Sequence, residues 1–100
     1  MAHIPEQTYR DHFRKNYQQA GYHNSQRTWN DYEPAYQYSY DQYGQRRGQR
    51  FEDVESDLER GWESTKANSR LAWSEAKEAV RDGWHHLERA MPGDADRDGR

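Results

Sequence analysis

The chain has 100 residues, no cysteine and a formal net charge of -3. This length suits one small domain, the lack of cysteine excludes disulfides and thiolate metal sites, and the acidic balance argues against a general nucleic-acid binder. Charged residues make up 33% of the chain against 31% for the hydrophobic set, and mean hydropathy is -1.65. Aliphatic area is therefore scarce, but four Trp, eight Tyr and two Phe can each bury a large area, so we expect an aromatic core.

The first predicted element covers roughly residues 5 to 20. Its aromatic residues Tyr9, Phe13 and Tyr17 recur at steps of four, with Ala20 three residues further on. This spacing predicts an amphipathic helix, and Gly21 is a suitable end for it. The next ten residues, YHNSQRTWND, are polar and turn-forming and predict a loop.

The second predicted helix is the tyrosine-rich tract YEPAYQYSYDQYGQ, residues 32–45. Four of its tyrosines step by four, four and three along one helical face: Tyr32, Tyr36, Tyr40 and Tyr43. A disordered tyrosine- and glutamine-rich tract is the alternative, but such a tract has no reason to keep helical spacing. Pro34 suits the first helical turn, with Asn30 or Asp31 as the cap. We therefore predict a helix that is at least half buried.

The strongest pattern is a pair of matching apolar stripes, each with residues at i, i+3, i+7 and i+11. The first stripe consists of Phe51, Val54, Leu58 and Trp62. The second begins 22 residues later and consists of Trp73, Ala76, Val80 and Trp84, with Leu87 and Met91 prolonging it. The stretches DLERGWE (57–63) and AVRDGWH (79–85) also resemble each other. The chain therefore contains two copies of one amphipathic helical unit.

Each copy carries a glycine directly before its last tryptophan, Gly61 in the first and Gly83 in the second. A glycine inside a helix costs roughly 1 kcal/mol against alanine, so we expect a packing reason. One interpretation is that the two glycines make room for rings from other helices. The other is that each glycine only loosens an exposed turn.

The segment ESTKANSR, residues 63–70, separates the two copies. The positions that would continue the stripe, Thr65, Lys66 and Ser69, are polar, and Asn68 with Ser69 could end one helix and cap the next. A single long helix is the rival interpretation, because 22 is twice the 11-residue period of a right-handed helical supercoil. The polar positions favour a break and hence an antiparallel helical hairpin.

Four stretches of the chain resemble an uncharacterised family of small bacterial stress-associated proteins. They are YEPAYQYSYDQYG (32–44), FEDVESDLERGWE (51–63), SRLAWSEAKEAVRDGW (69–84) and PGDADRDGR (92–100). The resemblance covers roughly residues 30 to 100 and rests on the spacing of Tyr and Trp. It implies a stress-related context, since members are sometimes fused to other stress-related domains. It brings no activity and no catalytic residues to this chain.

The C-terminal DADRDG, residues 94–99, matches the opening of an EF-hand loop, in which Asp94, Asp96 and Asp98 would converge on a hard cation. The bidentate Glu that an EF-hand places at its twelfth position does not follow in this sequence, so we expect a solvated acidic tail instead. The adjacent histidines His85 and His86 point about 100° apart on a helix and cannot chelate together. We expect no bound metal.

No pattern of a catalytic site is found in the sequence. The chain lacks a P-loop, a glycine-rich dinucleotide fingerprint and a nucleophile spaced with a base. Its carboxylates lie on helical faces opposite the aromatic stripes, where they are usually solvated. We therefore expect no enzymatic activity and no cofactor. The N-terminal residues lack the apolar run of a signal peptide and no stretch approaches membrane-spanning length, which predicts a cytoplasmic protein.

These features predict an all-α fold: a small bundle of three to four helices with a C-terminal antiparallel hairpin and an aromatic core. Residues 1–30 are expected to hold an N-terminal helix and a polar loop, with partial disorder left open. Residues 31–91 are expected to form the helical core module, and residues 92–100 the acidic tail.

The predicted core is drawn from the tyrosine tract and from both apolar stripes. Its members are Tyr36, Tyr40, Tyr43, Phe51, Val54, Leu58, Trp62, Trp73, Val80, Trp84 and Leu87. The three tyrosines of this set are expected to contact the stripe between Phe51 and Trp62. Tyr38 is expected to lie off that face.

Three functions stay open on the sequence alone. The first is a non-enzymatic bacterial module, stress-associated, that acts through protein–protein contacts or self-association. The second is a hydrophilin-like protectant, largely disordered in solution, for which four tryptophans are poorly suited. The third is a nucleic-acid accessory protein that uses QRRGQR (45–50) with neighbouring tyrosines as a stacking platform, which the net acidity disfavours.

Overall fold

The computed structural model describes residues 4–46, 49–65 and 69–90, and these form an all-α bundle, as the sequence predicts. The helices are α1 (Glu6–Asn16), α2 (Trp29–Gln45), α3 (Phe51–Thr65) and α4 (Trp73–Ala90), and one turn of 3-10 helix, Tyr17–Gln19, follows α1. No helix in these ranges is long and apolar enough to cross a membrane. The predicted acidic tail, with Asp94, Asp96 and Asp98, lies outside the described residues.

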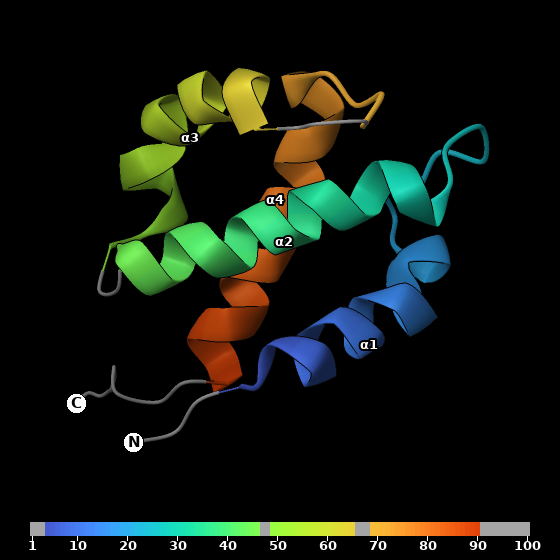
Figure 1. Ribbon diagram of the computed structural model, residues 1–100, viewed down its shortest axis with the longest axis horizontal. Coiled ribbons are helices and arrows are strands. Elements are labelled where there is room, and N and C mark those ends of the chain that lie inside the picture. Colours follow the sequence, from blue (N-terminus) through green and yellow to red (C-terminus); the bar gives the residue numbers. More distant parts are fainter. Residues whose placement is uncertain (1–3, 47–48, 66–68, 91–100) are drawn as a thin grey trace.

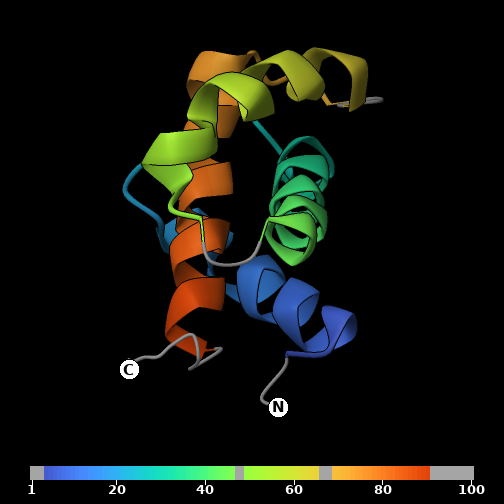
Figure 2. The same cartoon turned by 90° about the vertical axis from the view of Figure 1, so that its left-hand side faces the viewer.

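Helix α2 occupies the centre of the bundle (Figure 1). Its most extensive contact is with α4, which crosses behind it, while α1 packs along α2 and α3 packs on α4. The view turned by 90° shows α1 and α2 together on one side of α4, with α3 reaching across its upper end (Figure 2). Because α2 touches α1, α3 and α4, it buries more than one face.

The start of α2 differs from the prediction. The N-cap is Thr28, and Asp31 stands at the third helical position, where it forms a capping box with Thr28. The Thr28 backbone N–H donates to Asp31 Oδ2 at 3.0 Å, which satisfies a backbone donor that the helix leaves without a partner. The proposed caps Asn30 and Asp31 are therefore wrong. Pro34 consequently lies in the second turn and not in the first.

The two repeats form the predicted antiparallel hairpin. The helix breaks between Thr65 and Trp73, so the single long helix is excluded. Three contacts run in opposite chain directions: the rings of Phe51 and Trp84 lie 6.3 Å apart, Lys77 Nζ lies 2.8 Å from a Glu55 carboxylate oxygen, and the Trp62 indole donates to the Leu71 carbonyl at 3.0 Å. Figure 2 shows that the two helices splay apart and do not run side by side along their whole length.

The core is aromatic. Every predicted core residue is buried except Tyr40, which is partly exposed because it lies at the edge of α2 facing α1. The structure adds eight buried residues that the sequence did not single out for the core: Tyr9, Phe13, Tyr32, Ala35, Tyr38, Leu71, Ala76 and Ala79. Small alanines in this set let helices approach closely where the aromatic rings leave little room.

The prediction that Tyr38 lies off the face of α2 that contacts α3 is wrong. It is buried, its ring lies 5.7 Å from that of Trp62, and its hydroxyl donates to the Leu58 carbonyl at 2.8 Å. Tyr36 and Tyr40 instead face α1, where their rings lie 4.3 Å from Phe13 and 5.0 Å from Tyr9 respectively. A single helical face was assumed in the prediction, whereas α2 packs on three sides.

The two repeat glycines make room for tyrosine side chains, as one of the two interpretations requires. A Cβ atom at Gly61 would overlap the hydroxyl of Tyr38, and one at Gly83 would overlap the hydroxyl of Tyr9. Ser39 Oγ also lies only 2.9 Å from the Cβ position of Gly83. Both glycines are therefore required by close approach of another helix and not by backbone conformation.

The N-terminal segment shares the same core. Tyr9 and Phe13 of α1 are buried in the cluster that contains both repeats, and the Tyr9 hydroxyl donates to the Tyr36 carbonyl at 2.8 Å. The described part of residues 1–30 is thus packed onto the module and does not form a separate unit. Trp29, assigned to a loop by the sequence, is the first residue of α2.

Candidate functional site

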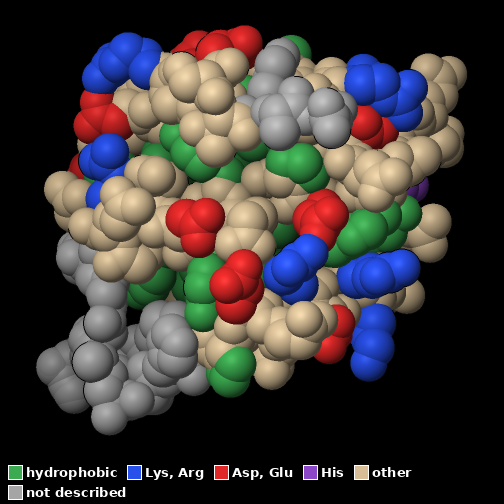
Figure 3. Space-filling model, in the orientation of Figure 1, with side chains coloured by type: hydrophobic (Ala, Val, Ile, Leu, Met, Phe, Trp, Pro, Cys, Tyr) green, Lys and Arg blue, Asp and Glu red, His purple; other side chains and the backbone are tan. Residues whose placement is uncertain are grey.

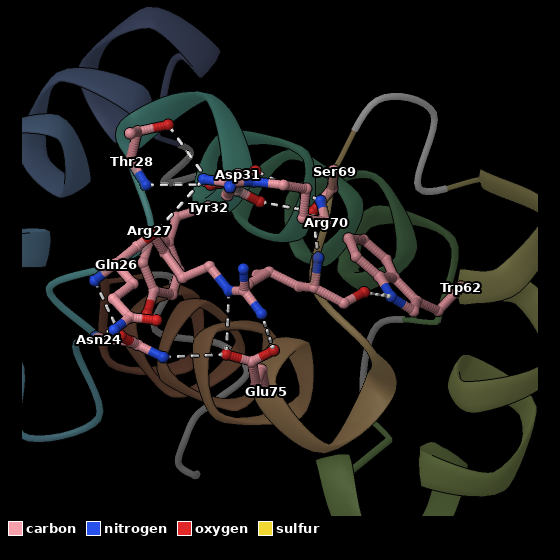
Figure 4. A network of polar contacts seen from close by, with 11 residues as sticks. Asn24, Gln26, Arg27, Thr28, Asp31, Tyr32, Trp62, Ser69, Arg70 and Glu75 are labelled. Atoms are coloured by element: carbon pink, nitrogen blue, oxygen red, sulfur yellow. Dashed lines mark hydrogen bonds and ion pairs between the residues drawn. The ribbon is translucent and has the colours of Figure 1, made fainter.

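A cluster of polar side chains joins the loop before α2 to the segment before α4 (Figure 4). Its centre is the Asp31 carboxylate, whose side chain is only 5% exposed and receives the Arg70 guanidinium, with Nη2 at 2.6 Å from Oδ2. The Ser69 hydroxyl donates to the Asp31 carbonyl at 2.7 Å. Through these bonds, the linker between the repeats is held against the first turn of α2.

A second ion pair lies beside the first. Arg27 donates two hydrogen bonds to the Glu75 carboxylate, at 3.2 and 3.0 Å, in the two-pronged geometry that guanidinium and carboxylate prefer. Asn24 donates a further one to the same carboxylate at 3.4 Å. The loop before α2 is in this way attached to the start of α4.

The carboxylates of this cluster are poorly suited to acid–base chemistry. The hydrogen bonds from Arg70 and from the Thr28 N–H hold the pKa of Asp31 well below its usual range. The Arg27 pair lowers the pKa of Glu75. A general acid or base works best with a pKa near the working pH, so both groups stay ionised and act as structural anchors.

Tyrosine hydroxyls form a second polar group where the loop before α2 meets α2 and α4. The hydroxyls of Tyr22 and Tyr36 lie 2.6 Å apart, and Tyr22 donates to Asp82 Oδ2 at 2.7 Å. Burial raises the pKa of both phenols well above the usual value, and it does the same for Tyr9. A phenol with a raised pKa is a weak nucleophile and a weak acid near neutrality, so these hydroxyls serve as hydrogen-bond donors within the core.

The basic cluster predicted at residues 45–50 is largely neutralised in its described part. An Arg46 guanidinium nitrogen lies 3.6 Å from Asp57, and Arg50 Nε lies 3.4 Å from Asp53. Arg47 lies outside the described residues. Each described arginine of this cluster therefore has a carboxylate partner.

Helices α1 and α2 enclose a small polar pocket of about 90 Å³. The lining comes from Gln7, Arg10, Asp11 and Arg14 of α1 and from Trp29 and Glu33 of α2. Arg10 forms an ion pair with Glu33 across the pocket, which joins the two helices. Figure 3 shows hydrophobic side chains bordered by cationic and anionic groups along the junction of these two helices. We call this set of six residues the α1–α2 pocket.

Two side chains stand out among the six that line the α1–α2 pocket. Trp29 is partly exposed, although its ring is supported by Tyr36 at 5.8 Å and by Tyr17 at 5.3 Å. Arg14 is exposed and forms no ion pair or hydrogen bond with another described residue.

The sequence placed Trp29 in a loop. The Thr28-x-x-Asp31 spacing was the available signal that α2 starts there.

His85 and His86 lie next to each other on α4. No group of three or more potential ligands is found in the part of the chain that the structure describes. His86 instead stacks on His12 of α1, with ring centres 4.2 Å apart and planes 19° apart. No sequence signal joins these two residues, because they lie on separate helices.

Comparison with known proteins adds no relative: no family model, no curated protein and no solved structure matches the chain.

Proposed function

We propose that this protein is a non-enzymatic helical module that binds a partner protein through the α1–α2 pocket. The observation that carries the proposal is the pairing of a partly exposed, well-supported indole with an exposed, unpaired guanidinium in one concave site. Trp and Arg are the residue types most enriched at the energetic centres of protein interfaces. A ring that is already held by Tyr17 and Tyr36 loses little conformational freedom on binding.

The size of the pocket favours a side chain of a protein over a small molecule. Ligand and cofactor sites typically enclose about 300–1,000 Å³ and are mostly apolar, whereas this pocket measures about 90 Å³ and is lined largely by polar groups. A site of this size takes one anchoring side chain, with the surrounding surface completing the contact.

The internal chemistry of the chain supports a binding role over catalysis. The carboxylates of Asp31 and Glu75 are held by arginines, and the buried tyrosine hydroxyls donate to acceptors inside the bundle. The aromatic core that joins all four helices supports a folded module over a disordered hydrophilin-like protectant. The resemblance to stress-associated bacterial proteins and the cytoplasmic expectation supply the proposed setting.

A photo-crosslinking experiment tests this proposal. A photoreactive amino acid at Gln7, which lines the pocket and is exposed, should capture one protein reproducibly in cells of the native host. Arg14→Glu should abolish that product. Lys15→Glu should leave it unchanged, because Lys15 carries the same charge on the same helix but does not line the pocket.

Two results would decide against a partner at this site. A product of twice the chain mass would identify self-association in place of a different protein. A captured protein whose yield is equal in wild type, Arg14→Glu and Lys15→Glu would show that the α1–α2 pocket does not form the contact.

A further inference from the structure

Two histidines from different helices stack face to face where α1 meets α4. His12 of α1 and His86 of α4 have ring centres 4.2 Å apart and an interplanar angle of 19°. His12 is exposed, and His86 is partly buried with the ring of Phe13 5.3 Å away and the ring of Tyr9 6.1 Å away. Phe13 and Tyr9 are the two side chains that α1 buries in the core, so the stack lies beside the anchor of α1.

Burial and two of the three titratable neighbours of His86 oppose its protonation. His12 faces it from α1, and Arg89 and Asp82 approach it from its own helix. Burial lowers the pKa of His86, and His12 and Arg89 lower it further, while Asp82 acts in the opposite direction. The Asp82 carboxylate is already engaged by the Tyr22 hydroxyl at 2.7 Å, and α2 contributes no charged group to the causes of the shift.

We propose that the His12–His86 stack is an acid-sensitive latch, which holds α1 against α4 when the rings are neutral and loosens α1 when both are protonated. The stack brings two like charges to within about 4 Å on acidification, and no carboxylate from α1 is among the groups that act on His86. An ordinary histidine has a pKa near 6.5, and burial lowers that of His86, so the change takes place as the pH falls below about 6.5.

Loosening α1 also dismantles the α1–α2 pocket, because four of its six lining residues belong to α1. In this last step the inference rests on the proposed function: partner binding would weaken under mild acid. The latch itself is a property of the isolated chain, and it is tested without any partner.

Hydrogen exchange of the α1 backbone amides measures the latch directly. In the wild-type chain, the protection factor of the amides around Phe13, corrected for the intrinsic exchange rate, should fall as the pH drops below about 6.5. Two unit charges 4 Å apart in water repel by an amount equivalent to roughly a fivefold change in an equilibrium constant. We therefore expect the protection factors of the α1 amides to fall by about fivefold or more. This fall should exceed any fall in the protection factors of the α3 amides.

His12→Gln is the informative variant, since His12 is exposed and its replacement keeps a polar side chain of similar reach. It should remove most of the pH dependence in α1 and raise the midpoint of the His86 titration measured by NMR. His85→Gln is the matched control. It removes a neighbouring histidine of α4 that does not stack on α1, and it should behave like wild type.

Three outcomes would overturn the latch: protection of α1 that does not change with pH, an equal loss in His12→Gln and wild type, or an equal loss in all helices. If α1 loosens as expected while crosslinking at Gln7 captures nothing, the latch stands and the proposed function fails. If crosslinking succeeds but the protection of α1 is independent of pH, the proposed function stands and the latch fails.

Discussion

Leu58 and Val80, which stand at equivalent positions in the two repeats, each accept a side-chain hydrogen bond from α2. The donor is Tyr38 Oη for Leu58 and Ser39 Oγ for Val80, and both distances are 2.8 Å. Each carbonyl lies three residues before the repeat glycine, whose missing side chain leaves space for the approaching hydroxyl. In both repeats, therefore, a hydroxyl group of α2 packs against the helix backbone at the same position of the repeat.

Replacing a repeat glycine by alanine should destabilise the protein. In Gly83→Ala the new methyl group would overlap the Tyr9 hydroxyl and press on Ser39, and overpacking of this kind typically costs about 1–3 kcal/mol. Gly44→Ala is the control, because nothing lies within 4 Å of its Cβ position, and it should stabilise α2 by roughly 0.5–1 kcal/mol. Urea unfolding of both variants measures the difference, and equal effects would contradict the packing role.

Gly61 allows a more specific test through a double-mutant cycle. Gly61→Ala displaces the Tyr38 hydroxyl from the Leu58 carbonyl, whereas Tyr38→Phe removes that hydroxyl and with it the overlap. The double variant should therefore be clearly more stable than the sum of the two single effects predicts. Additive free energies of unfolding would mean that Gly61 and Tyr38 do not interact.

The two repeat tryptophans should dominate stability. Trp62 and Trp84 are fully buried, and truncating a buried aromatic residue to alanine typically costs about 3–5 kcal/mol, which rivals the whole stability of a small domain. Trp62→Ala and Trp84→Ala should unfold the chain or leave it without fixed packing. Trp29→Ala should have a much smaller effect, because Trp29 is only partly buried. Thermal melting followed by circular dichroism compares the three, and equal small effects would rule out a cooperative core.

Acid should destabilise the protein partly through Asp31. Its pKa is lowered in the folded state, chiefly by hydrogen bonds from Arg70, so its stabilising contribution is complete above the unfolded value near 4 and is lost as the pH falls below it. Asp31→Asn should reduce the slope of the free energy of unfolding against pH in this range. The reduction should correspond to the uptake of up to about one proton on unfolding. Asp41→Asn, an exposed carboxylate of the same helix, serves as the control, and an unchanged slope in Asp31→Asn would contradict the assignment.

Alkali should reveal two classes of tyrosine. Burial raises the pKa of Tyr9, Tyr22 and Tyr36, so the stabilisation that these neutral phenols provide is complete below pH of about 10 and is lost as the pH rises above it. In an ultraviolet titration of the folded protein, these phenols should ionise only as the chain unfolds. A single class of tyrosines titrating near pH 10 before unfolding would contradict their burial.

Calcium should leave stability unchanged. Asp94, Asp96 and Asp98 match only the opening of an EF-hand loop, and we expect them to stay solvated. A rise in melting temperature with millimolar Ca²⁺ that Asp96→Ala abolishes would establish a site there.

Local patterns in the sequence were sufficient for the elements and for much of the core. Helical spacing identified the tyrosine tract, both repeats and the break between them, because the side chains that a helix buries recur along one face. These inferences need only the positions of residues along one segment. The glycine before each tryptophan was open to two interpretations, and the contacts of Tyr38 and Tyr9 decided for close approach.

Contacts between segments could not be obtained in this way. The burial of Tyr38 against Leu58 follows from the central position of α2, which packs on three sides and so defeats the assumption of one apolar face. The pairing of Asp31 with Arg70 and the stacking of His12 on His86 join residues whose local sequences carry no mark of each other. The sequence by itself determined where the helices lie and one apolar face of each, whereas the tertiary structure alone decided which faces meet, because that choice depends on how rings of different size pack together in space.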